Sequence, residues 1–310
     1  MKNIYKKILS AVTVLIGVTF LTFLLSWLSP SDPAAIRLSQ QGTNYSEELL
    51  EQTREEMGLN DPFLIQYVSW LRDLSRLDMG TSYRTGESVS VSLRETIPGT
   101  IALTCVSLMI TTGISIPAGI LCARKPDGPF DNCVRVITYL FSSLPSFFLS
   151  LLALYVFAVR LGWFHVVAEP GFRGMIMPAF VLGLTFAAWY TRQIRGLALE
   201  QTEAEYVKAL RCRGISEFRI YGKHVLKNCM LPIITLLGIS FGSLLGGSAI
   251  VEMIFSYDGV GKLAIEAVSY RDYPVIQAYA LWMAILFLAV NFLTDLLYSV
   301  LDPRAGRNRN

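Results

Sequence analysis

The stretch SYDGVGK, residues 256–262, comes closest in this sequence to a phosphate-binding loop. Such a loop needs spaced glycines whose backbone N–H groups surround the phosphates, a lysine, and then a Ser or Thr that holds Mg²⁺. Here the first glycine is missing, and Leu263 follows Lys262 where the Ser or Thr would stand. The stretch therefore does not predict nucleotide binding.

Other residue combinations that support catalysis or metal binding are also missing from the sequence. The two histidines, His165 and His224, are far apart in the chain, and the 5 cysteines form no CxxC pair. Structural metal sites usually show closely spaced ligands of these types. The apolar segments contain no arrangement of a nucleophile with a base, and no paired acid and base, that could support catalysis. We predict neither an enzyme nor a metal site, and we expect the cysteines to be small packing residues.

A basic insert, residues 204–228, lies between two long apolar segments. Its cations are Lys208, Arg211, Arg213, Arg219, Lys223 and Lys227. Apolar residues recur at helical spacing on both sides of Gly214, namely Val207 and Leu210 before it and Phe218, Tyr221 and Val225 after it. This pattern predicts two short amphipathic helices hinged at Gly214. Such helices bind a groove on a partner or a membrane surface, so we do not expect nucleic acid as the ligand.

The elements around this insert are membrane spans. Hydrophobic residues make up 53% of the chain and charged residues only 16%. Charge-free runs long enough to cross a bilayer cover 8–28, 96–123, 136–159, 174–191, 228–251 and 273–294. Unbroken apolar runs of this length are typical of helices and not of barrel strands. We expect kinks at Pro117 and Pro145, inside two of the runs.

The distribution of Lys and Arg predicts the orientation. With the N-terminus inside, 17 of the 27 Lys and Arg residues lie in the cytoplasmic segments, which are 1–7, 124–135, 192–227 and 302–310. Cytoplasmic loops of membrane proteins carry this excess of positive charge. Both termini and the basic insert are therefore predicted to lie in the cytosol.

The order EYVKALRCRG, KHVLKN and LPIIT resembles the cytoplasmic coupling loop of ABC-importer permeases, in the form found in the peptide and nickel branch. The matching residues are Glu205, Tyr206, Val207, Gly214, His224, Leu226, Asn228, Leu231 and Pro232. Ala209 stands one place before the usual alanine of that branch, and Leu210 occupies its position.

The resemblance extends over most of the chain. The further stretches are GLNDPFLIQYVSWL (58–71), LDMGTSYRTGESV (77–89), VEMIFSYDGVGKLAIEAVSYRDYPVIQ (251–277) and NFLTDLLYSVLDPR (291–304). One departure is Asp258, which stands where the family usually has proline in a turn. Because Gly259 and Gly261 are retained, we still expect the turn to form.

The resemblance implies an all-α integral membrane fold with six transmembrane helices, the type I importer permease fold, and both termini inside. Residues 1–28 would be the cytosolic N-terminus and first span, and residues 29–95 an extracytoplasmic segment with short helices. The permease core would cover 96–301, with spans near 97–123, 136–159, 174–191, 229–251 and 274–300 and the coupling loop at 192–228. Residues 302–310 would be a cytosolic tail. Within 29–95, SEELLEQTREEMG (46–58) predicts a helix capped by Ser46 and ended by Gly58, and FLIQYVSWLRDL predicts a second, amphipathic helix.

By the same resemblance, the chain is a non-catalytic permease subunit in the bacterial cytoplasmic membrane that imports small peptides or a nickel or metal chelate. It would bind no cofactor itself, because ATP and Mg would be held by two cytosolic ATPases. A second permease, an extracytoplasmic binding protein and membrane lipid would be its other partners. The residues expected to couple to the ATPase are Glu205, Tyr206, Ala209, Leu210, Arg213, Gly214 and Phe218. The residues considered for an external gate or for binding-protein docking are Glu252, Asp258, Gly259, Gly261, Arg271 and Asp272.

Two other interpretations of the sequence were considered. The chain could be a stand-alone channel or receptor whose basic loop senses lipid. The charged residues at the outer ends of the last spans could equally form solvated salt bridges with no role in gating.

Overall fold

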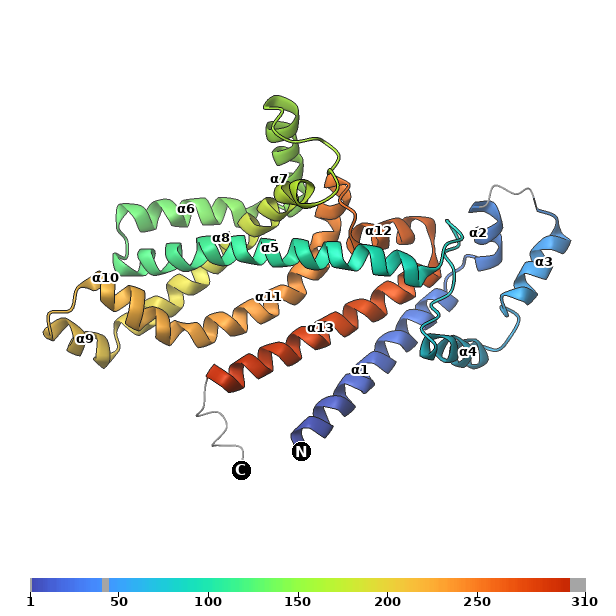
Figure 1. Cartoon of the computed structure of the whole chain (residues 1–310), viewed down its shortest axis with the longest axis horizontal. Coiled ribbons are helices and arrows are strands. Elements are labelled where there is room, and N and C mark those ends of the chain that lie inside the picture. Colours follow the sequence, from blue (N-terminus) through green and yellow to red (C-terminus); the bar gives the residue numbers. More distant parts are fainter. Residues whose placement is uncertain (1, 41–44, 302–310) are drawn as a thin grey trace. The chain divides into compact units, whose positions relative to one another are not determined.

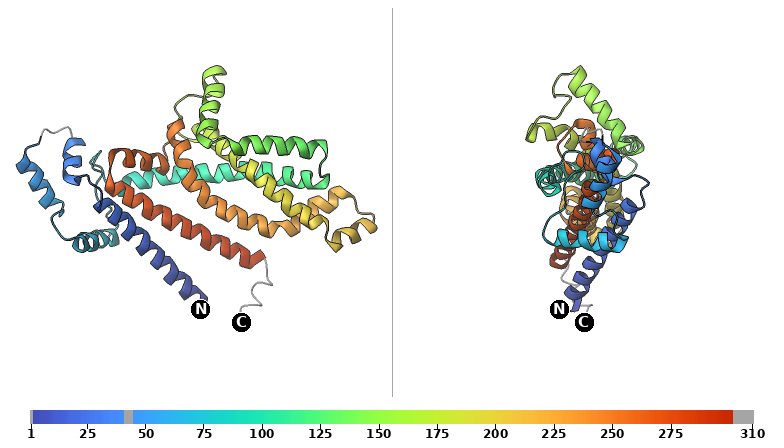
Figure 2. Two further views of the ribbon diagram at one scale, coloured as in Figure 1. Left: turned by 180° about the vertical axis from the view of Figure 1, so that it is seen from behind. Right: turned by 90° about the vertical axis from the view of Figure 1, so that its right-hand side faces the viewer.

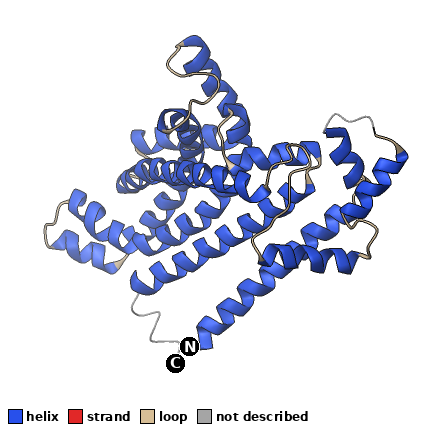
Figure 3. Ribbon diagram, turned by 45° about the vertical axis from the view of Figure 1, so that its right-hand side comes forward, coloured by secondary structure: helices blue, strands red, loops and turns tan. Residues whose placement is uncertain are grey.

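The structure is a computed structural model that describes residues 2–40 and 45–301 (Figure 1). The expected cytosolic tail, 302–310, lies outside the described residues. The chain divides into two compact units. Unit 1 comprises Met1–Thr100 and Asp258–Leu288, and unit 2 comprises Ile101–Tyr257 and Ala289–Asn310. Figure 3 shows that the described elements are helices joined by loops, and one isolated antiparallel bridge pairs Thr81 with Ser88.

Two of the unit boundaries fall within long helices, α5 (Val89–Arg124) and α13 (Tyr273–Leu301), and the third, between Tyr257 and Asp258, falls in a loop. Unit 1 also contains α1 (Lys2–Trp27), α2 (Pro33–Gln40), α3 (Glu47–Glu56), α4 (Phe63–Ser75) and α12 (Val260–Tyr270). Unit 2 also contains α6 (Pro129–Ser143), α7 (Ser146–Ala153), the π-helical η1 (Leu154–Arg160), α8 (Phe172–Thr202), α9 (Glu205–Cys212), α10 (Glu217–Arg219), the π-helical η2 (Ile220–Val225) and α11 (Leu226–Phe255).

Among the residues that the structure describes, five helical segments are long and apolar enough to cross a membrane. They are Lys7–Trp27, Val89–Arg124, Phe172–Thr202, Glu217–Phe255 and Tyr273–Thr294. Each contains or largely overlaps one of the predicted apolar runs, so five of the spans are confirmed as helices. Pro117 lies within α5, which continues through it to Arg124.

The remaining predicted span, 136–159, is not one straight helix. Its two halves, Pro129–Ser143 and Ser146–Arg160, meet at an angle of 101°. Leu144 between them has extended backbone angles, φ −92° and ψ 131°. A proline disfavours the helical conformation of the residue before it, and Pro145 caps the start of α7. The kink predicted at Pro145 is therefore a complete break, which we call the elbow.

The predicted helix at 46–58 is confirmed as α3. The Ser46 hydroxyl accepts a hydrogen bond from the Leu49 amide at 3.2 Å, which satisfies one of the free N–H groups of the first turn. After the helix, Gly58 takes a left-handed φ of 66°, the conformation glycine adopts at low cost. The local sequence alone thus specifies both ends of this helix.

The second predicted helix of this segment, α4, packs against α1 in unit 1 through aromatic rings. Tyr67 is buried, with its ring centroid 5.5 Å from those of Phe20 and Phe23 on α1. The Tyr67 hydroxyl also lies 3.0 Å from the hydroxyl of Thr19. Aromatic pairs at such separations contribute about 0.5–1.5 kcal/mol each beyond their buried area. This contact fixes part of the segment 29–95, which is predicted to be extracytoplasmic, to the C-terminal half of α1.

In unit 2, α8 packs against α11 and against α6, and Figure 2 shows α8 and α11 side by side. The contact of α8 with α5 depends on small residues. A Cβ added at Gly119 would lie 2.8 Å from Cγ2 of Ile194, and one at Gly183 would lie 2.6 Å from Cγ2 of Ile110. Both distances are shorter than van der Waals contact, so the helices approach closely only because these residues are glycine, as is common for membrane helices.

Candidate functional site

The basic insert folds as the sequence predicts, with one helix before Gly214 and helical structure after it. Glu205 lies in the first turn of α9, where its negative charge interacts favourably with the positive end of the helix dipole. After α9, Gly214 has a φ of 72°, and its N–H donates to the Arg211 carbonyl at 2.9 Å. Chain reversal at this point therefore depends on a backbone conformation that side chains with a Cβ rarely adopt.

The main apolar face of the insert packs on the chain itself. Val207, Tyr221 and Val225 are buried at 0%, 2% and 0% exposure in a cluster with residues of α8 and α11. The Tyr221 hydroxyl also lies 3.2 Å from the Thr202 hydroxyl at the end of α8. This differs from our expectation that the apolar face enters a partner. The pattern of apolar residues predicted the helices correctly but did not distinguish an internal contact from an external one.

The opposite side of the insert is exposed. Glu205, Ala209 and Arg213 are spaced by four residues, so they follow one face of α9. Gly214 is also exposed, and the Phe218 side chain is 72% exposed beyond it. We call these five residues the coupling surface, after the role expected of them. Figure 1 shows that α9 and α10, the two helices on either side of Gly214, project from the ends of α8 and α11. Tyr206 and Leu210, also expected to couple, are only partly exposed and pack against the buried cluster.

An ion pair spans the turn next to the coupling surface. Arg211 Nε donates to Glu217 Oε1 at 2.8 Å, and Nη2 donates to Oε2 at 3.3 Å. Hydrogen bonding to Glu217 raises the pKa of the Arg211 guanidinium above its ordinary value. Both side chains are 41% exposed, so water screens the pair. The pair joins α9 to α10 across Gly214. It restricts the conformation of the turn but leaves the turn exposed to solvent.

A second ion pair in unit 2 was not predicted from the sequence. Arg195 of α8 donates from Nε and Nη2 to the two carboxylate oxygens of Asp131 on α6, each at 2.7 Å. Asp131 is fully buried and also accepts from the Asp127 amide at 2.9 Å. The partners are 64 residues apart, and neither lies in a recognisable motif. The pair fixes α6 to α8.

The residues considered for an external gate fall in both units. In unit 2, Glu252 is fully buried and accepts from the Ser248 hydroxyl at 2.8 Å. In unit 1, Asp258 is 88% exposed and pairs with Lys262 at 2.9 Å. Gly259 caps the start of α12, and Gly261 is buried in its first turn, so the turn expected despite the loss of proline is present.

Arg271 and Asp272 take different roles within unit 1. Arg271 ends α12 with a left-handed φ of 56° and donates to the Ser31 hydroxyl at 2.7 Å. Asp272 is 3% exposed and accepts from the Ser82 hydroxyl and from the Tyr83 amide, the latter at 3.1 Å. Burial and, after it, the Asp272 charge raise the pKa of Tyr83. In the described residues, Asp272 anchors the loop that precedes α5 and forms no ion pair with Arg271.

Comparison with protein-family models identifies the family of this chain. Residues 115–307 match the family described as binding-protein-dependent transport system inner membrane component. Residues 1–104 match the N-terminal region described for the same membrane components. The chain belongs to this family. The permease is thus a multi-pass subunit of the cytoplasmic membrane and not an enzyme, which favours the importer over a stand-alone channel or receptor.

Relatives of the permease align over nearly its whole length. It is 36% identical to a putative peptide transport system permease protein of Brucella abortus, with 97% of this chain and 98% of that protein covered. It is 34% identical to the oligopeptide transport system permease protein AppB of Bacillus subtilis, again with 97% and 98% covered. It is also 34% identical to the metal-staphylopine import system permease protein CntB of Staphylococcus aureus, with 98% and 97% covered.

The fold is similar to that of a solved transporter. A chain of the MetNI methionine ABC transporter, in an inward-facing conformation, aligns with a TM-score of 0.57 at 20% identity. The alignment covers 68% of the permease and 96% of that chain. This likeness confirms the type I importer permease fold that the sequence predicts.

Proposed function

We propose that the permease forms half of the translocation path of an ATP-driven importer and transmits the ATPase cycle through the coupling surface. A second permease, two cytosolic ATPases and an extracytoplasmic binding protein would complete the system, with both termini inside. The observation that carries this proposal is the exposed Phe218, four residues after Gly214, on a loop whose other large apolar residues are buried or pack partly buried against the same cluster. Exposed aromatic residues on an ordered loop are typical anchors of protein interfaces.

The charges around Phe218 support an ATPase groove as the binding site. Glu205 and Arg213 lie on the same exposed face, so the surface has an aromatic centre with charged residues of both signs at its edge. Interfaces commonly combine an apolar centre with a polar rim. A change of this groove on ATP binding would move the equilibrium between inward and outward conformations, because only a differential interaction shifts such an equilibrium.

The test is the variant Phe218→Ser, compared with Phe172→Ser. Phe172 is 69% exposed at the start of α8, on the side predicted to be external, so the two variants remove equally exposed rings. Loss of a central aromatic anchor costs about 2–4 kcal/mol, or at least about thirtyfold in affinity. We expect Phe218→Ser to lose its ATPase subunits on affinity purification in mild detergent, and Phe172→Ser to retain them.

Two outcomes would count against the proposal. Unchanged recovery of ATPase subunits with Phe218→Ser would exclude Phe218 as the anchor. Purification of the unaltered permease without any ATPase, under conditions that preserve a control ABC complex, would contradict the importer as a whole.

For the substrate, we propose short peptides, with a metal chelate as the second candidate. The printed names of the Brucella and Bacillus relatives support peptides, and that of the Staphylococcus relative supports a metal chelate. Deletion of the gene should abolish uptake of labelled dipeptides if the first proposal is correct. Loss of nickel or cobalt accumulation under metal scarcity, with normal dipeptide uptake, would select the second.

A further inference from the structure

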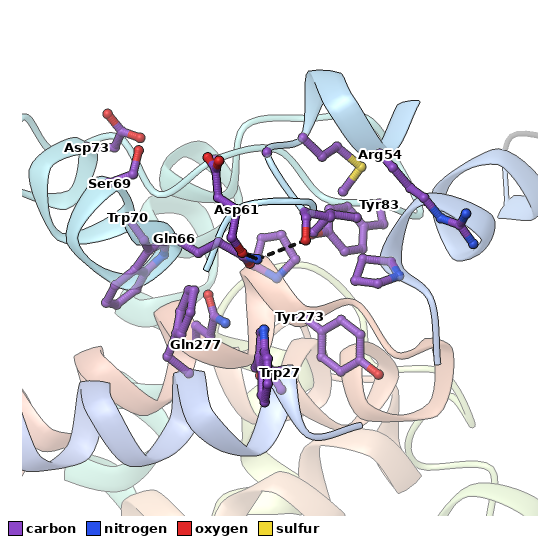
Figure 4. Close-up of a pocket in the computed structure, with 18 of the residues that line it drawn as sticks. Trp27, Arg54, Asp61, Gln66, Ser69, Trp70, Asp73, Tyr83, Tyr273 and Gln277 are labelled. Carbon is purple, nitrogen blue, oxygen red and sulfur yellow. Dashed lines mark hydrogen bonds between the residues drawn. The ribbon is translucent and has the colours of Figure 1, made fainter. Parts of the chain in front are cut away.

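Unit 1 contains a cavity of about 470 Å³ that none of the roles above uses. It lies among the end of α1, the segment with α3 and α4, and the start of α13 (Figure 4). This volume is within the range of about 300–1,000 Å³ that is usual for small-molecule sites. By the predicted orientation it opens on the extracytoplasmic side. The cavity is therefore accessible to solutes or lipid headgroups outside the cell.

Aromatic and apolar side chains form one part of the lining. They are Phe23, Trp27, Pro33, Met57, Leu59, Trp70, Met79, Tyr83, Tyr273 and Pro274. Trp27 is 50% exposed, although tryptophan side chains are usually mostly buried. Tyr273, in contrast, is only 8% exposed. Aromatic faces attract cations through the negative potential of their rings, in addition to covering an apolar body. This part of the lining suits an amphipathic ligand.

The charged residues of the lining are three carboxylates and one arginine: Asp32, Asp61, Asp73 and Arg54. The arginine is already neutralised, because Arg54 Nη2 lies 2.9 Å from Asp32 Oδ2 and Nη1 lies 2.9 Å from Glu51 Oε2. In the described part of the chain, the carboxylates of Asp61 and Asp73 take part in no such pair. The uncompensated charge of the cavity is thus negative.

The carboxylates and the aromatic rings of the lining lie on different sides of the cavity. In Figure 4, Asp61 and Asp73 lie on one side of the group, and Trp27, Tyr273 and Gln277 lie on the other. The Gln66 amide between them is fixed by hydrogen bonds to the Leu59 and Asp61 carbonyls, at 3.0 and 2.7 Å. A ligand in this space meets carboxylates at one end and rings at the other.

We propose that this cavity binds an organic cation, a protonated or quaternary ammonium group carried on an apolar body. Asp61 and Asp73 supply the charge, and the aromatic residues cover the apolar part. An anion is disfavoured because Arg54, the arginine among the described lining residues, is paired. The ammonium could belong to a free amine or to an ethanolamine lipid headgroup, which share the chemistry that the cavity recognises. The proposal goes beyond the proposed function, since it needs neither an ATPase nor transport.

The test is calorimetric binding of 2-phenylethylammonium to the full-length permease, with the subunits that co-purify with it, in phosphatidylglycerol nanodiscs. 2-Phenylethanol and 3-phenylpropionate provide neutral and anionic probes of similar shape. We expect a dissociation constant below about 1 mM for the cation and at least about tenfold weaker binding of the other two. This comparison uses the unaltered chain, so it does not depend on a variant that folds.

Variants then locate the site. Asp61→Asn and Asp73→Asn should each weaken binding of the cation about tenfold, because each removes a charge-assisted contact. Glu56→Gln removes a carboxylate from the same segment outside the cavity and should leave binding unchanged. Asp73→Glu keeps the charge and should bind within about threefold of the unaltered chain. Thermal unfolding of each variant verifies that it is folded.

The lipid composition separates the two sources of the ammonium group. If a headgroup occupies the cavity, nanodiscs with phosphatidylethanolamine should weaken binding of the probe about tenfold by competition; if a free amine is the ligand, the affinity should not change. Either result supports the site. The proposal is overturned if the cation binds no better than the alcohol, or if folded Asp61→Asn and Asp73→Asn bind it as well as the unaltered chain does.

Discussion

Two ion pairs in unit 2 have similar geometry but different surroundings. Asp131 and Arg195 meet at 2.7 Å with exposures of 0% and 21%, whereas Arg211 and Glu217 meet at 2.8 Å with 41% exposure each. The first pair joins two long helices, and the second spans the turn beside the coupling surface. Burial, and not distance, therefore separates a contact that maintains the fold from one that leaves a loop free to respond to a partner.

The largest effect should come from the buried pair. Arg195→Met leaves the Asp131 carboxylate buried without its counter-ion, which typically costs about 3–5 kcal/mol. We expect a lower unfolding temperature in detergent and loss of the α6–α8 contact, detected as faster proteolysis of the loop at 125–128. The double variant Asp131→Leu with Arg195→Met should recover much of the stability, since no charge is then buried. Equal instability of the single and double variants would show that packing, not charge, dominates there.

The next effect concerns the turn itself. Gly214→Val places a β-branched residue at a φ of 72°, where the strain is about 1–2 kcal/mol, although open space surrounds the position. Gly214→Asn is the matched control, because asparagine tolerates this conformation. We expect the valine variant to insert normally in the membrane but to transport at a reduced rate, and the asparagine variant to transport nearly normally. Normal uptake with valine would remove Gly214 from the coupling mechanism.

The smallest effect should come from the exposed pair. Arg211→Gln removes a screened contact worth less than about 1 kcal/mol, so the unfolding temperature should hardly change. Transport should fall only slightly, and high salt should reduce the difference between variant and unaltered chain. A loss of stability as large as that of Arg195→Met would contradict the comparison drawn above.

The sequence predicted features that depend on neighbouring residues. The caps of α3 at Ser46 and Gly58, the reversal at Gly214 and the break at Pro145 each follow from one or two residue types. Helix α5, by contrast, begins at Val89 and not near 96, because Arg94 and Glu95 end the apolar run without ending the helix. Hydropathy locates the part of a helix that lies in the hydrocarbon core of the bilayer, and the helix itself can extend beyond that core.

Contacts between distant parts of the chain were not predictable in this way. Asp272 accepts from Ser82 across 190 residues, and nothing near either residue indicates the other. The same limit explains why the apolar side of the basic insert was assigned to a partner: Val207 and Tyr221 have the same pattern whether they cover their own core or another protein. The family resemblance predicted the fold class because it reflects such distant contacts collectively.

The elbow at Leu144–Pro145 bears on the predicted orientation of the chain, with both termini on one side of the membrane. Five straight spans alone would place the two termini on opposite sides, because an odd number of crossings inverts the chain. The termini share a side only if α6 and α7–η1 together complete a further crossing. Since these arms meet at 101°, they cannot both run along the bilayer normal. If both termini lie in the cytosol, as predicted, the sixth crossing runs through a segment with an interrupted helical backbone, and at least one of its two arms is inclined to the bilayer normal.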